Sequence, residues 1–498
     1  MYTAGVKLGG AALVIVAVLG LAGAAAADGP KVYSVGPGKK VRELADLVGK
    51  LRPGDVVEVY GNATYKPVKL TDHGTADARI TIRGIRVDGK RPVISGGKWT
   101  VAFHYAHFNT FEGFEVTGGE QVCIRHQSRE IIVRDTVVHH CARHGILGAD
   151  DESGSLLLDT VEVHHAGGKP QGENLKHPIY IATDSRKWPG SVFRMQFSYI
   201  HDVVGGNAVK SRAERTELYY NWIEGAQYYE AELIGPGGRC QGVREDGDVV
   251  GNALVQTSSH ESGVYVVRVG GDGTGETCGR YRFVNNLFVA RGDTDGPLRC
   301  HEGIESIELH NNVFFKLGGK PFTQLVRTKE CNWTQGEQIF GTHNWVTKGT
   351  PVPATVTQSV FGTGPGFADA EAFDFRLTGK GPLVDAGTKD TAVGGTFAFP
   401  SPAGLPEYVP PPRKLLAYGK SVRRQAIGPI DIGPYERGSP SARPVRRGKL
   451  SAGGAPSSGS GSNRRSLGCA AASRGGDAAI PLAGIVALVW WRRRRTSS

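Results

Sequence analysis

The sequence predicts an all-β solenoid, in which short coils stack along one axis. The first observation is a phrase that recurs eight times: an Asp, Asn or Ser, one intervening residue, then an apolar residue within strand-like sequence. The phrases begin at Asp135, Asp159, Ser198, Asn221, Asn252, Asn286, Asn312 and Asn344. Steps of 23 to 39 residues suit one coil of three short strands, with loops in the longer steps.

The second observation is the composition between these phrases. The chain has 71 Gly and 27 Pro, and no apolar pattern of helical period lasts more than a turn or two within the repeats. Short β-branched or aromatic runs, such as residues 131–133 and 287–289, indicate strands instead. An Asn or Asp at a tight corner tolerates the left-handed conformation, and its amide can bond the next coil. We therefore interpret the recurring residue as scaffold.

This arrangement resembles the right-handed parallel β-helix of pectate-lyase-like proteins, over roughly residues 30 to 437. The resemblance implies a single-stranded right-handed parallel β-helix. An N-terminal capping helix is predicted over residues 41–51, because apolar residues recur there at helical spacing: Val41, Leu44, Leu47, Val48 and Leu51. Phrases beginning at Phe373, Pro382 and Asp431 resemble the closing pattern of bacterial β-helix proteins.

Both ends of the chain carry predicted targeting segments. Residues 1–27 read as a signal peptide, with an apolar stretch followed by small residues. The β-helix domain is expected over 28–438, and the Pro-, Gly-, Ser- and Arg-rich residues 439–466 as a disordered linker. Residues 467–498 combine a Gly-Cys pair, a short apolar run and an Arg cluster, and resemble the myxobacterial C-terminal sorting signal. We expect a secreted protein anchored at the cell envelope or surface, with the membrane as a partner of this tail.

The net charge of +11 comes from the two ends of the chain. Residues 440–498 hold eleven Lys and Arg against one Asp, whereas the body has 47 basic and 47 acidic residues. The charge therefore does not indicate a nucleic-acid partner, and none is predicted; a monomer is expected. The arginine cluster of the tail is read as a positive-inside stop signal.

Six cysteines of the body suit an oxidising compartment: Cys123, Cys141, Cys240, Cys278, Cys300 and Cys331. Their spacing can place Cys278 opposite Cys300, and Cys123 opposite Cys141, although fifteen pairings remain open. No Cys-x-x-Cys pattern is present, and no metal ligand is predicted.

Candidate site residues lie on outward positions of neighbouring coils. With a period of two, Lys210 and Arg212 face outward in the strand 209–212. The same rule places Tyr180 on the preceding coil, and both Glu230 and Glu232 on the following one. Together these residues predict one charged patch on an outer sheet. A further outward residue, expected to bind substrate, is Arg125.

The phrase at residues 207–213, Asn-Ala-Val-Lys-Ser-Arg-Ala, resembles the polysaccharide lyase family that includes chondroitinase B and alginate lyases. In that family a Lys on the outer sheet abstracts the C5 proton of a uronate, and an Arg of the next coil assists. The resemblance implies that Lys210 is the base of a β-elimination. Arg212 would assist by disfavouring the charged form of Lys210.

The sequence departs from that family where Glu230-Ala-Glu-Leu-Ile replaces an Arg-His pair, and where acidic calcium ligands are missing before Lys210. Glu230 and Glu232 would repel a uronate, but with Arg212 they can bind a calcium ion or a neutral sugar. Calcium is the one cofactor considered, and none is certain. The same residues also fit an ordinary surface ion-pair network.

Histidines form a second cluster: His139, His140, His164, His165, His177 and His201. Their pairs in successive coils predict a stacked ladder, which is usually solvated rather than catalytic. His177 with Tyr180 can supply the base and acid of a lyase, or mark only a loop-to-strand junction.

Two functions remain open. One is a polysaccharide lyase acting on uronate polymers, and the other is a non-catalytic glycan-binding or adhesin-like solenoid. A polygalacturonase-like hydrolase fits less well, because its Asn-Thr-Asp and Gly-His-Gly phrases are missing.

Overall fold

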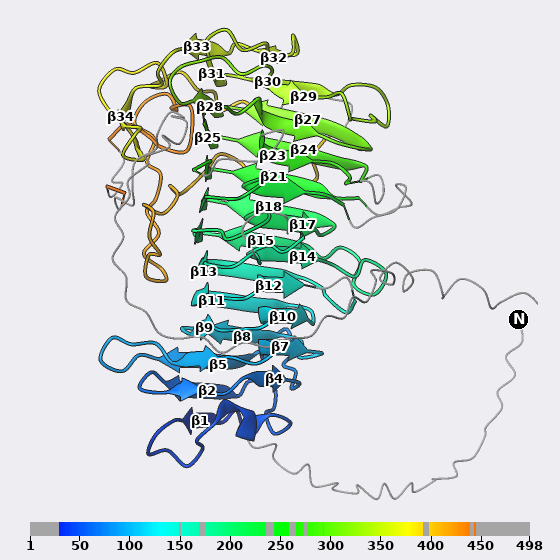
Figure 1. Cartoon of the computed structure of the whole chain (residues 1–498), viewed down its shortest axis with the longest axis vertical. Helices are drawn as coiled ribbons and strands as arrows, with labels where there is room; N and C mark the ends of the chain where they lie inside the picture. Colours follow the sequence, from blue (N-terminus) through cyan, green and yellow to red (C-terminus); the bar gives the residue numbers. More distant parts are fainter. Residues whose placement is uncertain are drawn as a thin grey trace, which may run out of the picture. The chain divides into compact units, whose positions relative to one another are not determined.

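The computed structural model describes residues 29–148, 151–168, 175–235, 244–257, 265–272, 277–291, 293–391, 398–438 and 443–444. Over these ranges the chain forms the predicted parallel β-helix. Successive coils stack along the long axis from the blue to the yellow end of the colour bar, and a typical coil adds one strand to each of three rows (Figure 1). Every strand pairing between neighbouring coils of the described helix is parallel, so the ladders run along the stack.

One row is a separate ten-stranded sheet, which carries the candidate site. Its strands, in order along the stack, are β4 (Val68–Leu70), β7 (Trp99–His104), β10 (Val122–Gln127), β12 (His144–Gly148), β14 (Ile179–Ala182), β17 (Val209–Arg212), β20 (Ala231–Leu233), β23 (Tyr265–Val269), β26 (Gly296–Cys300) and β29 (Val326–Arg327).

The other two rows merge into a 23-stranded sheet, because β11 and β13 run through the corner between them. The first row holds β1 (Val32–Val35), β2 (Val56–Tyr60), β5 (Ile80–Ile85), β8 (Asn109–Glu112), β11 (Ile131–His139), β13 (Leu156–His164), β15 (Val192–Gln196), β18 (Arg215–Tyr219), β21 (Asp246–Val250), β24 (Gly279–Val284), β27 (Ile304–His310), β30 (Ile339–Thr342) and β32 (Val356–Thr357). The second row adds β3 (Thr64–Tyr65), β6 (Val93–Ser95), β9 (Glu115–Thr117), β16 (Tyr199–His201), β19 (Trp222–Glu224), β22 (Ala253–Val255), β25 (Leu287–Ala290), β28 (Val313–Lys316), β31 (Trp345–Thr347) and β33 (Val360–Gly362).

A buried amide ladder joins the coils at the corner between the first and second rows. The Oδ1 atom of Asn252 accepts the backbone N–H of Asn221 at 2.8 Å and its side-chain amide at 2.9 Å. The same pattern links Asn252 to Asn286, and then continues to Asn312 and Asn344. These asparagines are fully buried, so each amide satisfies backbone groups that water cannot reach. The scaffold interpretation of the recurring Asn is confirmed.

Two details of the predicted corner were wrong. The ladder position in the earlier coils is held by Thr136 and Val161, not by Asp135 and Asp159, because Thr136 pairs with Val161 and the N–H of Val161 bonds Oγ of Ser198. The left-handed residue is the one before the ladder position. Examples are Tyr220 (φ 58°) before Asn221 and Gly251 (φ 69°) before Asn252.

The predicted N-terminal capping helix is reduced to a single 3₁₀ turn, η1 (Leu44–Leu47). The apolar face was nevertheless assigned correctly, because Leu44, Leu47 and Leu51 are buried against the first coil. A capping box between Glu43 and Asp46 closes the start of the turn, and extended backbone at Val48 ends it.

The C-terminal segment packs along the outer side of the second row. Beyond the antiparallel pair β34 (Phe367–Asp369) and β35 (Asp374–Leu377), it covers outward apolar residues of that row and forms a second core. Trp222 stacks on Phe375 at 5.7 Å, and Arg413 makes a two-pronged ion pair with the buried Glu224 at 2.9 Å. The yellow and orange segments beside β25 and β28 show this packing (Figure 1).

Between described residues, two disulfides link neighbouring coils. Cys123 bonds Cys141, in agreement with the spacing argument, with Cα atoms 5.7 Å apart. The suggested facing of Cys278 and Cys300 was wrong, because Cys300 bonds Cys331. Which cysteines face each other depends on the length of the coils between them. The spacing of 22 residues between Cys278 and Cys300 did not reveal that length.

Several predictions fall on residues outside the described ranges: the signal peptide 1–27, nearly all of the linker 439–466, the tail 467–498, and Cys240. Within the ranges that the structure describes, no helix is long and apolar enough to cross a membrane.

Candidate functional site

Outward side chains of the ten-stranded sheet form one continuous column, which we call the outer column. Its members face each other strand by strand: Lys69, Ala102, Arg125, Leu147, Tyr180, Lys210, Glu232, Arg268, Arg299 and Arg327. Neighbouring strands lie about 4.8 Å apart, so the column spans roughly 40 Å. The register brings four predicted site residues, Arg125, Tyr180, Lys210 and Glu232, into a single line.

The centre of the column is a dense ion-pair network around Lys210. Its Nζ lies 3.0 Å from Oε2 of Glu232 and 3.3 Å from Oδ2 of Asp272. The same Asp272 oxygen lies 2.5 Å from a guanidinium nitrogen of Arg212. From sequence, Arg212 was expected to disfavour the charged form of Lys210. The structure instead places the Asp272 carboxylate between the two cations.

Sequence reasoning missed Asp272, which lies 62 residues beyond Lys210. It follows β23, two coils further along the stack, and its approach depends on the conformation of the chain after that strand. No local signal identified it.

Glu232 holds the network together from the neighbouring strand. Besides Lys210, its carboxylate contacts a guanidinium nitrogen of Arg268 at 2.7 Å and accepts the side-chain amide of Asn207 at 2.5 Å. Its side chain is only 4% exposed, so these three donors replace the solvent that a free carboxylate would need. Glu232 therefore lies where it was predicted, with every contact made to a donor of the protein.

Tyr180 and Arg212 lie on the other side of Lys210. The Tyr180 ring centroid is 5.5 Å from Nζ of Lys210. Burial lowers the pKa of Arg212, but the nearby Tyr180 and Asp272, both hydrogen-bonded to the guanidinium, more than offset this and leave that pKa raised. Arg212 is thus a permanent cation that can orient the Tyr180 hydroxyl.

The structure changes the role expected of His177. Its side chain is buried, and its Nδ1 accepts the backbone N–H of Asn207 at 3.0 Å, so the remaining proton lies on Nε2. Burial, and then the charges of Lys210 and His144, hold the pKa of His177 well below its usual value. A neutral, buried imidazole with a committed Nδ1 cannot act as the predicted base; it positions Asn207, which in turn reaches Glu232.

The prediction for Glu230 was wrong. Glu230 precedes β20 and its carboxylate turns back to accept the backbone N–H of Ala226 at 3.2 Å. The side chain is fully buried, which raises its pKa well above the usual value, and the backbone hydrogen bonds only partly offset this. The strand begins one residue later than the period-two argument assumed, so Glu230 does not join the outer column.

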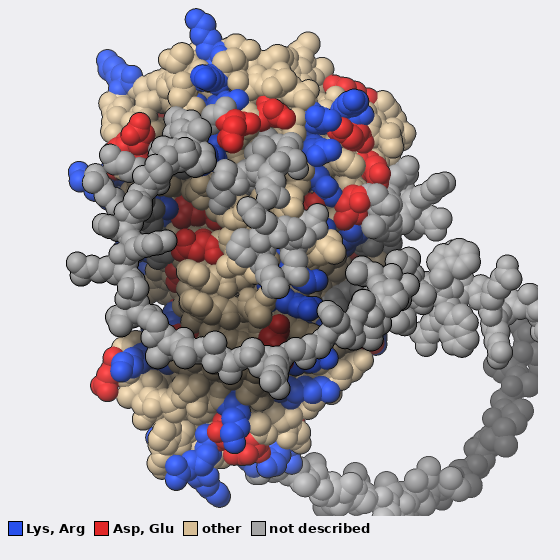
Figure 2. Space-filling model, in the orientation of Figure 1, with Lys and Arg blue, Asp and Glu red and all other residues tan. Residues whose placement is uncertain are grey.

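Three arginines continue the column beyond Glu232. The guanidinium of Arg268 lies over the Tyr229 ring at 5.6 Å, and Arg299 donates to the Tyr229 hydroxyl at 3.3 Å. Arg327 pairs with Glu330 at 2.5 Å. Figure 2 shows basic and acidic side chains side by side at the upper right, where Figure 1 places β27 and β29.

The signal for this arginine run was present but incomplete. β23 extends from Tyr265 to Val269 and includes Arg268, which was not among the predicted site residues. The remaining predicted residue, Arg125, lies on the opposite side of Tyr180 and stacks over the Trp99 ring at 4.5 Å.

The residues present do not fit the calcium ion considered from sequence. Glu230 is buried away from the column, and the carboxylates of Glu232 and Asp272 are already paired with Lys210, Arg268 and Arg212. Calcium prefers six to eight oxygen ligands, and here cations occupy those oxygens. Within the described ranges, side chains that could hold a metal gather instead at three histidines on another part of the coil.

The chain matches no protein-family model and no curated protein sequence. Among solved structures, it is similar to XylC in complex with xylose at 11% identity, with 68% of this chain and 87% of that chain covered and a TM-score of 0.43. A pectate lyase, Pel9A, is similar at 11% identity over 82% of this chain and 96% of that one, with a TM-score of 0.42. A mannuronic acid specific polysaccharide family 6 lyase from human gut microbiota gives 13% identity, 63% and 80% coverage, and a TM-score of 0.40. The likeness is one of fold.

Proposed function

We propose that this protein binds an acidic polysaccharide along the outer column and cleaves it by β-elimination at the column's centre. The observation that carries the proposal is the single line of Tyr180, Lys210, Glu232 and the arginines Arg268 and Arg299. A row of planar guanidinium groups at the spacing of the coils suits successive carboxylates of an extended polymer.

The proposed chemistry uses three groups of the column. Arg268 neutralises the uronate carboxylate, which stabilises the charge that develops when the C5 proton leaves. Lys210, as the neutral amine, takes that proton; the C4–O4 bond breaks as the C4–C5 double bond forms. The Tyr180 hydroxyl, which is held by Arg212, gives its proton to the leaving O4. The products are an unsaturated uronate end and a shortened chain.

Glu232 and Asp272 contact the ammonium form of Lys210. That form must lose a proton before the amine can act as a base.

The test is the ultraviolet absorbance of the unsaturated product after incubation with alginate, pectate or glycosaminoglycans. Lys210→Ala should lower the rate at least about 100-fold, because it removes the general base. The matched control is Lys69→Ala, which removes a lysine of the same column far from the centre and should change the rate little. No absorbance change with any of these polymers would contradict the lyase proposal.

A second candidate is a non-catalytic glycan-binding surface. It is favoured by one observation: Lys210, Arg212, Glu232, Asp272 and Arg268 are all already ion-paired, which suits a rigid binding surface. In that case the polymer binds without product formation, and binding weakens with added salt. Arg299→Ala should then weaken polymer binding. Neither the parent nor Lys210→Ala should form product from the polymer.

We also propose that the β-helix acts as a monomer outside the cell and is held at the envelope by the C-terminal tail. The disulfides Cys123–Cys141 and Cys300–Cys331 between coils support an oxidising compartment. Protease accessibility on intact cells tests the location, and removal of residues 467–498 should release the protein to the medium.

A further inference from the structure

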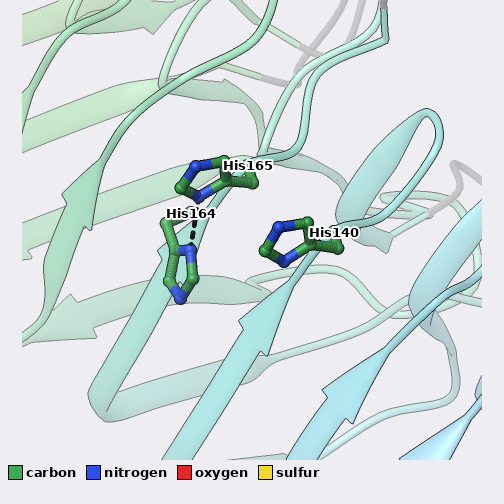
Figure 3. Close-up of side chains that lie close together, drawn as sticks. All are labelled: His140, His164 and His165. Carbon is green, nitrogen blue, oxygen red and sulfur yellow. Dashed lines mark hydrogen bonds between the residues drawn. The ribbon is translucent and has the colours of Figure 1, made fainter.

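Histidines gather where the second row of strands ends, away from the outer column. His139 ends β11, His164 ends β13, and their rings stack at 5.0 Å; His201 of β16 continues the stack at 4.9 Å. The predicted histidine ladder is therefore confirmed. The residues that follow, His140 and His165, form a second stack at 4.6 Å. Figure 3 shows His140, His164 and His165 with their rings gathered at this corner.

Backbone conformation sets His140 and His165 apart. Both adopt the left-handed conformation, with φ of 49°. The equivalent corner of neighbouring coils carries Gly118 and Gly225, which adopt this conformation without a Cβ penalty, and Asp202, which tolerates it. Two consecutive coils thus hold an imidazole at a position where the fold otherwise uses residues suited to this conformation.

Three imidazoles approach each other closely enough to share a ligand. One ring nitrogen from each of His140, His164 and His165 lies within 4.8 Å of one from each of the others. In a tetrahedral zinc site with Zn–N bonds of 2.0–2.1 Å, ligand nitrogens lie about 3.3 Å apart. Closing the difference needs movements of about 1.5 Å, which side-chain rotation supplies. His140 and His165 are exposed, so an ion can enter from solvent.

Hydrogen bonds within and around the cluster decide which lone pairs an ion can use. Nδ1 of His164 and Nδ1 of His165 share one at 2.7 Å, which an ion bound through both atoms would replace. Nε2 of His139 lies 3.0 Å from Glu115, so it carries the proton, and Nδ1 of His139 then accepts Nδ1–H of His140 at 2.7 Å. The lone pair of His140 is consequently on Nε2. A carboxylate that fixes a tautomer through a histidine is a common outer shell of metal sites.

His201 does not belong to the candidate ligands, because both of its ring nitrogens are hydrogen-bonded. Nδ1 lies 2.7 Å from Asp202, and Nε2 lies 2.9 Å from Glu162.

We propose that His140, His164 and His165 bind one divalent transition-metal ion of the class that imidazole prefers, such as Zn²⁺, Cu²⁺ or Ni²⁺. Three nitrogen ligands leave a fourth coordination position open to water at the exposed face. This site is independent of the proposed polysaccharide function.

The experiment titrates Zn²⁺ by calorimetry, and Co²⁺ by visible absorbance, into full-length protein that has been treated with a chelator. We expect one equivalent to bind, with the absorbance bands of nitrogen-ligated Co²⁺. His140→Gly/His165→Gly should weaken Zn²⁺ binding at least about 10-fold. Gly118 and Gly225 show that nearby coils accept glycine at this corner, so this variant should unfold, without metal, at a temperature no lower than that of the parent.

The matched control is His73→Ala/His107→Ala. These two rings also stack, at 5.8 Å, but they belong to no three-ligand group within the described residues. This variant should keep the metal. The proposal is overturned if no ion binds in the micromolar range, if the double glycine variant binds Zn²⁺ as the parent does, or if the control loses as much affinity.

Discussion

Replacement of Glu232 by Gln should destabilise the centre of the outer column while preserving its shape. The substitution removes one negative charge that contacts two cations, Lys210 at 3.0 Å and Arg268 at 2.7 Å. The amide oxygen of Gln can still accept the hydrogen bond from Asn207. The change is therefore electrostatic rather than steric.

The size of the stability loss depends on which carboxylate partners Lys210 and Arg268 keep. Lys210 keeps Asp272 at 3.3 Å, whereas Arg268 has no other carboxylate partner among the described residues. The side chains of Lys210, Glu232 and Arg268 are 10%, 4% and 14% exposed, so solvent compensates only weakly. Removing one partner of a buried ion pair costs about 3–5 kcal/mol, and we expect Glu232→Gln to lie at the lower end of that range.

The assay is guanidinium-induced unfolding of Glu232→Gln, Arg268→Gln and the double variant. The double variant should lose about 1–3 kcal/mol less than the sum of the single variants, because the two residues contact each other. The matched control is Glu217→Gln on the first row. There a buried glutamate contacts Arg194 and Arg215 at 2.5 and 2.6 Å, but these arginines are 46% and 18% exposed, so a smaller loss of stability is expected away from the outer column.

Adding a polyuronate should distinguish Glu232→Gln from Glu217→Gln by their unfolding midpoints. If the polymer lies along the outer column, its carboxylates can pair with Arg268 and should raise the unfolding midpoint of Glu232→Gln more than that of the parent. Glu217→Gln should show no such extra gain. The electrostatic reasoning fails if Glu232→Gln costs less than about 1 kcal/mol, or if the losses of the two single variants add fully.

Three further predictions concern the scaffold. Asn252→Ala should cost about 2–4 kcal/mol in denaturant unfolding, because it leaves the buried N–H of Asn221 without an acceptor; a loss like that of a surface substitution would contradict the ladder's role. Burial raises the pKa of Glu245 to about 8. The parent should therefore lose stability as pH rises from about 4.5 through 8, by roughly 1.4 kcal/mol per pH unit, whereas Glu245→Gln should not. Parallel profiles of stability against pH for the two proteins would refute this. Arg413→Met should leave Glu224 buried without a counter-ion and free the C-terminal segment, so limited proteolysis should cut that segment faster than in the parent, and an unchanged rate would count against the docking.

The fold was predictable because its causes are local. Each coil repeats the same short strands and the same corner, and the buried Asn252, Asn286 and Asn312 bond the equivalent residue of the next coil. The exact register of the strands was harder to predict from the sequence. A shift of one residue separates Asp135 from the ladder position held by Thr136, and period alone does not determine it.

The site was predictable only in part, for the same reason. Tyr180, Lys210 and Glu232 occupy equivalent positions of consecutive coils, so alternation placed them in one line. Glu230 failed because its strand begins one residue later, and a carboxylate before a strand can turn back to its own backbone.

By itself, the sequence determined the coiled architecture, its buried amide corner and the outward direction of Lys210, since these depend on residues close together in the chain. Only the tertiary structure decided that Asp272 meets Lys210 and Arg212, that Arg268 completes the surroundings of Glu232, and that three histidines of two coils converge. The physical reason is that loops of unequal length separate the coils, so contacts between coils depend on where each loop returns the chain to the stack.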